Sequence, residues 1–93
     1  MILSFKGKEA GKIWERKSSK KLPLSIQQRA YDKLLLLNAS TGLKDLMIPS
    51  ANRLEKLVGD RKDQYSIRIN EQWRICFSWD RGDAYNVEIL DYH

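Results

Sequence analysis

The sequence predicts an α+β fold, with an N-terminal strand and two main helices packed on one face of a mainly antiparallel sheet. Apolar residues recur at spacings of three and four through the first half of the chain, which is typical of amphipathic helices. From residue 65 the spacing changes to two, with short breaks, which is typical of strands joined by hairpins. The helices can then cover the apolar face of a three-strand meander.

The first elements follow from apolar spacing. Residues 1–5 are expected to form a strand, and residues 9–16 a short amphipathic helix. Ser25 is expected to cap the principal core helix. The run of four leucines at 34–37 predicts that the end of this helix is buried on more than one side. The helix presents one apolar stripe, which Tyr31 and Leu35 widen: Ile26, Ala30, Leu34 and Leu37.

The three predicted strands cover residues 65–69, 73–79 and 85–90. Their register follows from matching apolar faces, because an odd slip would set apolar side chains against polar ones. Centring the first hairpin on Glu71 and the second on Gly82 satisfies this condition. The expected apolar pairs are Ile69 with Trp73, Ile67 with Ile75, Tyr65 with Phe77, Trp79 with Tyr85, Phe77 with Val87, and Ile75 with Ile89.

The same register places charged residues on the other, exposed face. Arg68 lies directly opposite Arg74, and Tyr92 is expected on that face beside them. Like charges opposite each other weaken a sheet, so the pair indicates an anion between them. The alternative is that two arginines and a tyrosine only keep an open sheet face soluble.

Composition narrows the classes of function. The 93 residues contain 17 Lys and Arg against 12 Asp and Glu, a net charge of +5 that favours a polyanionic partner. One histidine and one cysteine exclude an internal disulfide and a Cys-cluster zinc site, so no metal or other cofactor is expected. No apolar run reaches the roughly 20 residues that span a bilayer, and no signal peptide is recognised, so a cytoplasmic protein without membrane contact is expected.

The surplus charge lies in residues 1–21, which hold seven bases and two acids. A basic periodic segment of this kind is typical of a solvated helix face. It can also increase long-range attraction to a polyanion.

Two sequence blocks carry a family resemblance. Residues 68–77 read RINEQWRICF, and residues 87–93 read VEILDYH. Together with ILSF at 2–5, NRLE at 52–55 and the Gly-Asp-Arg turn at 59–61, they make the chain similar to the HigB branch of RelE-like toxins. The resemblance covers essentially the whole chain, so residues 1–93 are expected to form a single toxin domain.

This resemblance implies a RelE-like fold and a role as the toxin of a bacterial type II toxin–antitoxin system. Members enter the ribosomal A site and cut mRNA without a metal, using the 2′-hydroxyl of the substrate as nucleophile. The implied partners are the ribosome, mRNA and a HigA-like helix-turn-helix antitoxin, with operator DNA bound only through the toxin–antitoxin complex. The alternative is a non-catalytic RNA- or DNA-binding module, or an accessory subunit that acts only with the antitoxin.

The resemblance also implies roles for particular residues. Arg68 and Arg74 would stabilise charge on phosphorus, because guanidinium groups offer forked donors to phosphate oxygens. Tyr92 would stack on a base or assist proton transfer. His93 is the only side chain of a type whose unperturbed pKa, about 6.5, suits acid–base work near neutrality, and Asp91 would orient or charge it. The residues expected to bind nucleic acid are Arg53, Lys56, Arg61 and Lys62.

One segment departs from the family pattern. Related toxins can carry basic residues where this chain has Glu55 and Val58. Either Lys56 substitutes as the nearest base, or Glu55 is itself the general base. Cys76 has no neighbouring histidine motif, so a nucleophilic role for it is not expected.

Overall fold

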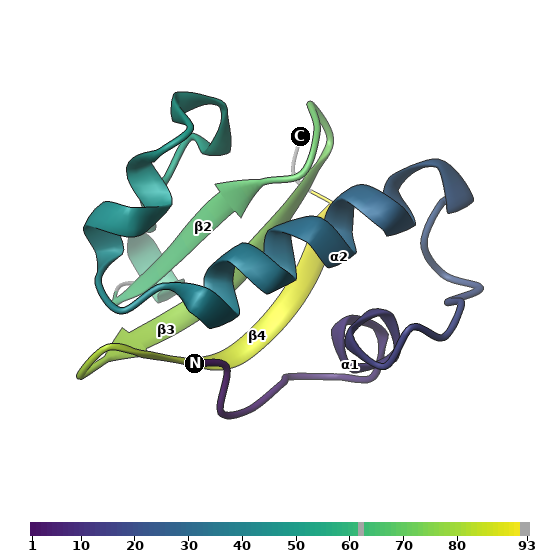
Figure 1. Cartoon of the computed structure of the whole chain (residues 1–93), viewed down its shortest axis with the longest axis horizontal. Helices are drawn as coiled ribbons and strands as arrows, with labels where there is room; N and C mark the ends of the chain where they lie inside the picture. Colours follow the sequence, from purple (N-terminus) through teal and green to yellow (C-terminus); the bar gives the residue numbers. More distant parts are fainter. Residues whose placement is uncertain (62, 92–93) are drawn as a thin grey trace.

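The computed structural model describes residues 1–61 and 63–91, and it confirms the α+β prediction. A sheet of antiparallel strands is covered by helices on one face, and α2 runs diagonally across that face (Figure 1). The helices are α1 (Glu9–Trp14) and α2 (Leu24–Ala39), with short 3₁₀ turns η1 (Leu43–Met47), η2 (Ser50–Asn52) and η3 (Gly59–Arg61). The strands, in their order across the sheet, are β1 (Glu55–Lys56), β2 (Gln64–Arg68), β3 (Trp73–Asp80) and β4 (Asp83–Asp91).

The predicted stripe of α2 does form its buried face. The stripe packs against the apolar residues of the sheet, among them Ile67, Ile75 and Phe77, none of which is exposed. The prediction for the leucine run holds only in part: Leu34 and Leu37 are buried and Leu36 is partly buried, but Leu35 remains 43% exposed. Successive helical positions point about 100° apart, so four consecutive leucines cannot all face one sheet.

The start of α2 also differs from the prediction. The helix begins at Leu24 after Pro23, and no side chain caps it, so Ser25 lies inside the first turn. Proline suits this position because its fixed φ, here −56°, leads into the helix, and its missing N–H would have no helical partner there.

The first hairpin has the predicted register. Tyr65 pairs with Phe77, Ile67 with Ile75, and Arg68 with Arg74. The register of the second hairpin is correct only at the end near Arg74, where Ile75 pairs with Ile89 and Arg74 with Leu90. Near the loop it is shifted by one residue, so Trp79 pairs with Ala84, and Tyr85 lies opposite Ser78.

Backbone geometry at two places explains this shift. Arg81 and Gly82 both have positive φ, 52° and 85°, as a two-residue type I′ turn requires. The extra residue in β4 is taken up by a bulge opposite Cys76–Ser78, where Asn86 has φ 52°. The bulge brings Ala84 and Val87, rather than Tyr85 and Val87, into the core.

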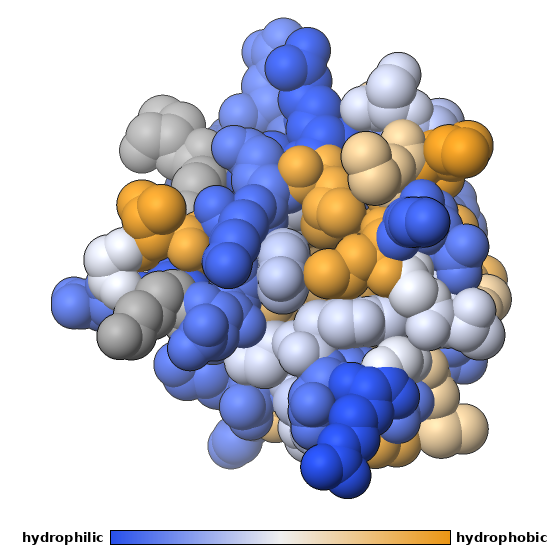
Figure 2. All heavy atoms as spheres, turned by 90° about the vertical axis from the view of Figure 1, so that its left-hand side faces the viewer, coloured by the Kyte–Doolittle hydropathy of each residue, from blue (hydrophilic) through white to orange (hydrophobic). Residues whose placement is uncertain are grey.

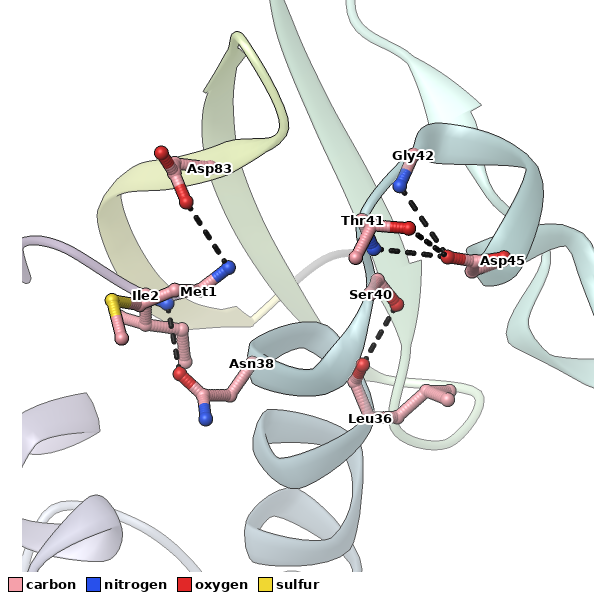
Figure 3. Close-up of polar contacts among 9 residues, drawn as sticks. All are labelled: Met1, Ile2, Leu36, Asn38, Ser40, Thr41, Gly42, Asp45 and Asp83. Carbon is pink, nitrogen blue, oxygen red and sulfur yellow. Dashed lines mark hydrogen bonds and ion pairs between the residues drawn. The ribbon is translucent and has the colours of Figure 1, made fainter.

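The predicted N-terminal strand is reduced to isolated bridges. Ile2 and Phe5 each form a parallel bridge with β4, to Ala84 and Val87. The amino group of Met1 lies 3.3 Å from the Asp83 carboxylate, and the Ile2 amide donates to Asn38 Oδ1 at 2.9 Å (Figure 3). These contacts join the start of the chain to the end of α2 and to the β3–β4 hairpin.

The loop after α2 is ordered by one carboxylate. Asp45 Oδ2 accepts hydrogen bonds from the amides of Thr41 at 2.9 Å and Gly42 at 3.3 Å (Figure 3). The Ser40 hydroxyl donates to the Leu36 carbonyl at 2.8 Å and closes the last turn. The backbone hydrogen bonds hold the pKa of Asp45 below its ordinary value, because they favour the charged form.

The sequence predicted that the face of the sheet away from α2 is exposed, and this prediction is wrong, because much of the face is covered. Ser66 and Cys76 on this face have no exposed surface. Arg61 reaches across the sheet to Glu88 of β4, with Nη1 and Oε2 3.3 Å apart. Residues 50–61, which we call the covering segment, therefore cover this face. Figure 2 views the molecule from the left of Figure 1 and shows apolar side chains beside hydrophilic ones on that side.

Candidate active site

A groove of about 530 Å³ lies where the covering segment meets the β2–β3 hairpin. It contains three guanidinium groups, two carboxylates and one amide, so positive charge exceeds negative charge by one. We call it the arginine groove, and its lining residues are Arg53, Glu55, Arg68, Asn70, Glu71 and Arg74.

Strand pairing brings these residues together from three parts of the chain. The β2–β3 register sets Arg68 opposite Arg74, and the short β1 strand sets Glu55 opposite Ser66. Arg53 has a left-handed backbone, φ 44°, at the point where η2 turns into β1. The structure thus brings Arg53, predicted to bind RNA, together with both predicted catalytic arginines.

Arg74 was expected to be exposed, but it is buried, with only 7% of its surface accessible. Its Nε donates to the Ser66 hydroxyl at 2.8 Å, and Nη2 donates to the Ser66 carbonyl at 3.3 Å and to the Arg53 carbonyl. Nη2 also lies 3.1 Å from the Glu55 carboxylate. Arg74 can be buried because Ser66 of β2 and the covering segment together supply the partners that a charged group needs when it leaves water.

Arg68 is the more accessible of the two paired arginines. Its side chain is 28% exposed and forms an ion pair of 3.9 Å with Glu71, which is 94% exposed. A pair this long and this solvated holds its partners weakly. Arg68 can therefore reorient toward a ligand, whereas Arg74 is held in place by hydrogen bonds.

The C-terminal candidates are only partly described. β4 ends at Asp91, opposite Trp73, and Asp91 Oδ2 accepts a hydrogen bond from Gln72 Nε2 at 2.9 Å. This places Asp91 at the tip of the β2–β3 hairpin, the structure that carries Arg68 and Arg74. Tyr92 and His93 lie outside the described residues.

Two of the remaining predicted RNA-binding residues, Lys56 and Arg61, do not line the arginine groove. Lys56 is exposed on β1, opposite Tyr65. The Arg61 guanidinium donates to Gln64 at 3.2 Å and to Glu88 at 3.3 Å, so it joins the covering segment to the sheet. Lys62 lies outside the described residues.

Two residues that support the groove, Ser66 and Asn70, were not singled out from the sequence. Ser66 holds Arg74 from beneath, and a small polar residue between apolar strand positions was its only signal. Asn70 Oδ1 accepts hydrogen bonds from the amides of Gln72 and Trp73, both at 2.8 Å, and orders the hairpin turn. Asparagine favours such turns because its side chain can bond its own backbone two residues on.

The one cysteine of the chain, Cys76, is buried in the sheet. Burial raises the pKa of the Cys76 thiol to about 11, so this side chain stays protonated at neutral pH. Over residues 1–61 and 63–91, no three His, Cys, Asp or Glu side chains gather as a metal site would require. Within the same part of the chain, no helix is long and apolar enough to cross a membrane.

Known proteins match this sequence over nearly its whole length. The family described as "RelE-like toxin of type II toxin-antitoxin system HigB" matches residues 3–93. Toxin HigB-1 of Vibrio cholerae serotype O1 is 40% identical, and the match covers 100% of this chain and 98% of the relative. Endoribonuclease HigB of Proteus vulgaris is 33% identical, with 100% of both chains covered.

Solved structures support the fold at much lower identity. A YafQ mutant from E. coli superposes with a TM-score of 0.61 at 10% identity, covering 98% of this chain and 93% of the other. The YoeB–YefM complex from Staphylococcus aureus gives 0.58 at 15% identity, covering 100% and 98%. These likenesses show a shared backbone architecture.

Proposed function

The chain belongs to the HigB family of RelE-like toxins of type II toxin–antitoxin systems, and we propose that it acts as an endoribonuclease on mRNA at the ribosomal A site. One observation carries the proposal for the active site. Arg74 is buried, fixed by protein hydrogen bonds and opposite a second, more accessible arginine in one groove. Residues 1–93 would act as one toxin domain.

The proposed reaction uses the 2′-hydroxyl of the substrate. Its oxygen forms a bond to the adjacent phosphorus, and the bond from phosphorus to the 5′-oxygen of the next nucleotide breaks. The products are a 2′,3′-cyclic phosphate and a free 5′-hydroxyl. Arg68 and Arg74 would stabilise the negative charge that develops on the phosphoryl oxygens, a contribution that preorganised donors make with little reorganisation.

The proton transfers need a base and an acid. Glu55 lines the groove and its carboxylate lies 3.1 Å from Arg74 Nη2, whereas Lys56 does not line the groove. This placement supports Glu55 as the base that accepts the 2′-hydroxyl proton. His93 would donate a proton to the departing 5′-oxygen, Asp91 would orient His93, and Tyr92 would stack on a base.

No step in this scheme requires a metal-bound nucleophile, since the substrate supplies its own hydroxyl. The same requirement explains why RNA, and not DNA, would be cut. Arg53, Lys56, Arg61 and Lys62 would contact the RNA strand or the ribosomal RNA around the groove. The net charge of +5 supports attraction to these polyanions.

We further propose a HigA-like helix-turn-helix antitoxin as partner, and operator DNA bound only through the toxin–antitoxin complex. The family assignment supports an antitoxin, and a structural neighbour was solved as the YoeB–YefM complex. The proposed site of action is the cytoplasm, where translating ribosomes supply the substrate.

Primer extension on a reporter mRNA tests this function. Purified protein is expected to cut within translated codons when ribosomes are translating, and not when they are omitted. Replacing the ribonucleotide before one cut by its 2′-deoxy analogue should abolish that cut alone. Intact message with retarded migration on a native gel would instead indicate a non-catalytic binding module.

A further inference from the structure

A second groove adjoins the arginine groove on the side of the hairpin that faces α2. Its volume is about 700 Å³, and it lies between Arg29 and Lys33 of α2 and the β2–β3 hairpin. We call it the helix groove. The two grooves share Arg68, Asn70 and Glu71, so they adjoin each other at the hairpin.

The helix groove concentrates positive charge. Arg29 and Lys33 are four residues apart on α2, a spacing at which like charges face each other and destabilise a helix. Burial, and then the charge of Arg29, lower the pKa of Lys33, while Asp32 acts in the opposite direction. Arg68 adds a third cation at the junction of the two grooves.

Asp32 and Glu71 also line the helix groove, so its cations exceed its acids by one. Arg68 pairs with Glu71, whereas the hydrogen bonds of Arg29 and Lys33 go to neutral acceptors. Arg29 Nη1 donates to the Ile69 carbonyl at 3.4 Å, and Lys33 Nζ donates to Asn52 Oδ1, so both acceptors are neutral. Asp32 instead accepts a hydrogen bond from Gln28 at 3.0 Å. Among the described residues, neither Arg29 nor Lys33 forms an ion pair within 4.0 Å. An arginine with five N–H donors and a lysine with three keep capacity for an anionic ligand.

We propose that the helix groove binds the phosphate backbone of the single-stranded RNA that flanks the cleaved bond, with Arg29 and Lys33 each contacting a phosphate. The inference rests on the proposed function, because it assigns the flanking strand to the groove that adjoins the proposed cleavage site. Contacts of this kind carry no base information. The helix groove thus sets how much RNA the protein holds, and not which codon it cuts.

The test compares RNA lengths in a binding measurement. Fluorescein-labelled 2′-O-methyl RNAs of about 4 and about 16 nucleotides, which cannot be cleaved, are titrated with protein and followed by anisotropy. The variant is Arg29→Gln with Lys33→Gln, which removes two charges and retains hydrogen-bond donors. The matched control, Lys20→Gln with Lys21→Gln, removes the same charge at exposed positions outside both grooves.

We expect the double variant to bind the long RNA roughly 10- to 30-fold more weakly at about 0.1 M salt. The slope of log K against log salt should fall by about 1.4, since each single-strand phosphate contact contributes about 0.7. Affinity for the short RNA should stay within about twofold of that of the unmodified protein, and the control pair should change the long-RNA slope much less. A double variant that binds the long RNA no more weakly than the control pair overturns the proposal.

Two further measurements distinguish RNA binding in the helix groove from the proposed catalysis and from antitoxin binding. Cut mapping with the same proteins tests the proposed function: absence of cuts by the unmodified protein overturns catalysis, whereas the anisotropy result still decides whether the groove binds RNA. Copurification with a coexpressed antitoxin tests another occupant. If the double variant keeps its RNA affinity and loses the antitoxin, the groove is an antitoxin surface and the RNA proposal is wrong.

Discussion

Removing the Arg74 side chain is expected to cost stability as well as activity. Arg74→Ala deletes the hydrogen bonds from a charged donor to the Ser66 hydroxyl and the Arg53 carbonyl. Such bonds contribute about 1.5–3 kcal/mol each, and the exposed Glu55 partner adds little because water screens it. We expect the free energy of unfolding to fall by about 3–6 kcal/mol, out of the roughly 5–15 kcal/mol of a typical domain.

Urea unfolding followed by tryptophan fluorescence measures this change, and Arg68→Ala is the matched control. Arg68 forms only the 3.9 Å pair with an exposed glutamate, so its removal should cost at most about 1 kcal/mol. Both variants should lose mRNA cleavage. If the two variants unfold within about 0.5 kcal/mol of each other, Arg74 does not fix the covering segment as we describe.

Further predictions concern the loops and the thiol. Gly82→Ala should destabilise by about 1–2 kcal/mol in thermal melts, because φ is 85° and a Cβ would lie 3.1 Å from the Thr41 carbonyl, whereas Gly42→Ala should be nearly neutral. The pKa of Asp45 is lower in the folded protein than in the unfolded chain, where it is near 3.8. The Asp45 carboxylate therefore stabilises the fold fully above the unfolded-state pKa, and this stabilisation is lost as the pH falls through the folded-state pKa. The Tm deficit of Asp45→Asn should therefore shrink in acid. Cys76 should resist iodoacetamide at pH 8 until the protein unfolds, because its thiol pKa is about 11.

The sheet could be predicted because side-chain alternation is a local signal. Pairing Arg68 with Arg74 required only that apolar faces match across one short hairpin, and the structure confirms that pair. The register of the second hairpin could not be predicted from side-chain alternation alone. A two-residue turn at Arg81–Gly82 and a bulge near Asn86 cancel each other in register, so the pattern alone fitted a simpler pairing.

The burial of Arg74 could not be predicted for a related reason. The segment that covers it contains a two-residue strand and short 3₁₀ turns, none long enough to show a hydrophobic period. Its cohesion depends on single contacts, such as Arg61 with Glu88 and Asn52 with the carbonyls of Leu46 and Ile48. Contacts between distant single residues leave no periodic trace in a sequence.

The candidate site was predictable in part. The two arginines followed from register, and the structure brings them together. The catalytic roles of Asp91, Tyr92 and His93, which the resemblance implies, stay predictions. Ser66 and the helix-groove pair Arg29 and Lys33 were missed, because their importance depends on how α2 and the covering segment pack against the hairpin. Arg29 and Lys33 lie beside the apolar stripe of α2, where cations ordinarily indicate a solvated helix face.

The most direct test of the account measures 2′,3′-cyclic phosphate ends on mRNA from a purified translation reaction, with unmodified protein and with Arg68→Ala. The unmodified protein is expected to produce these ends inside translated codons. Arg68→Ala, with its unfolding curve nearly unchanged, is expected to lower their rate of formation by about 10²-fold or more, the usual loss on removing one donor to developing charge. Formation of the same ends at the unmodified rate by Arg68→Ala would contradict the claim that the arginine groove cleaves RNA.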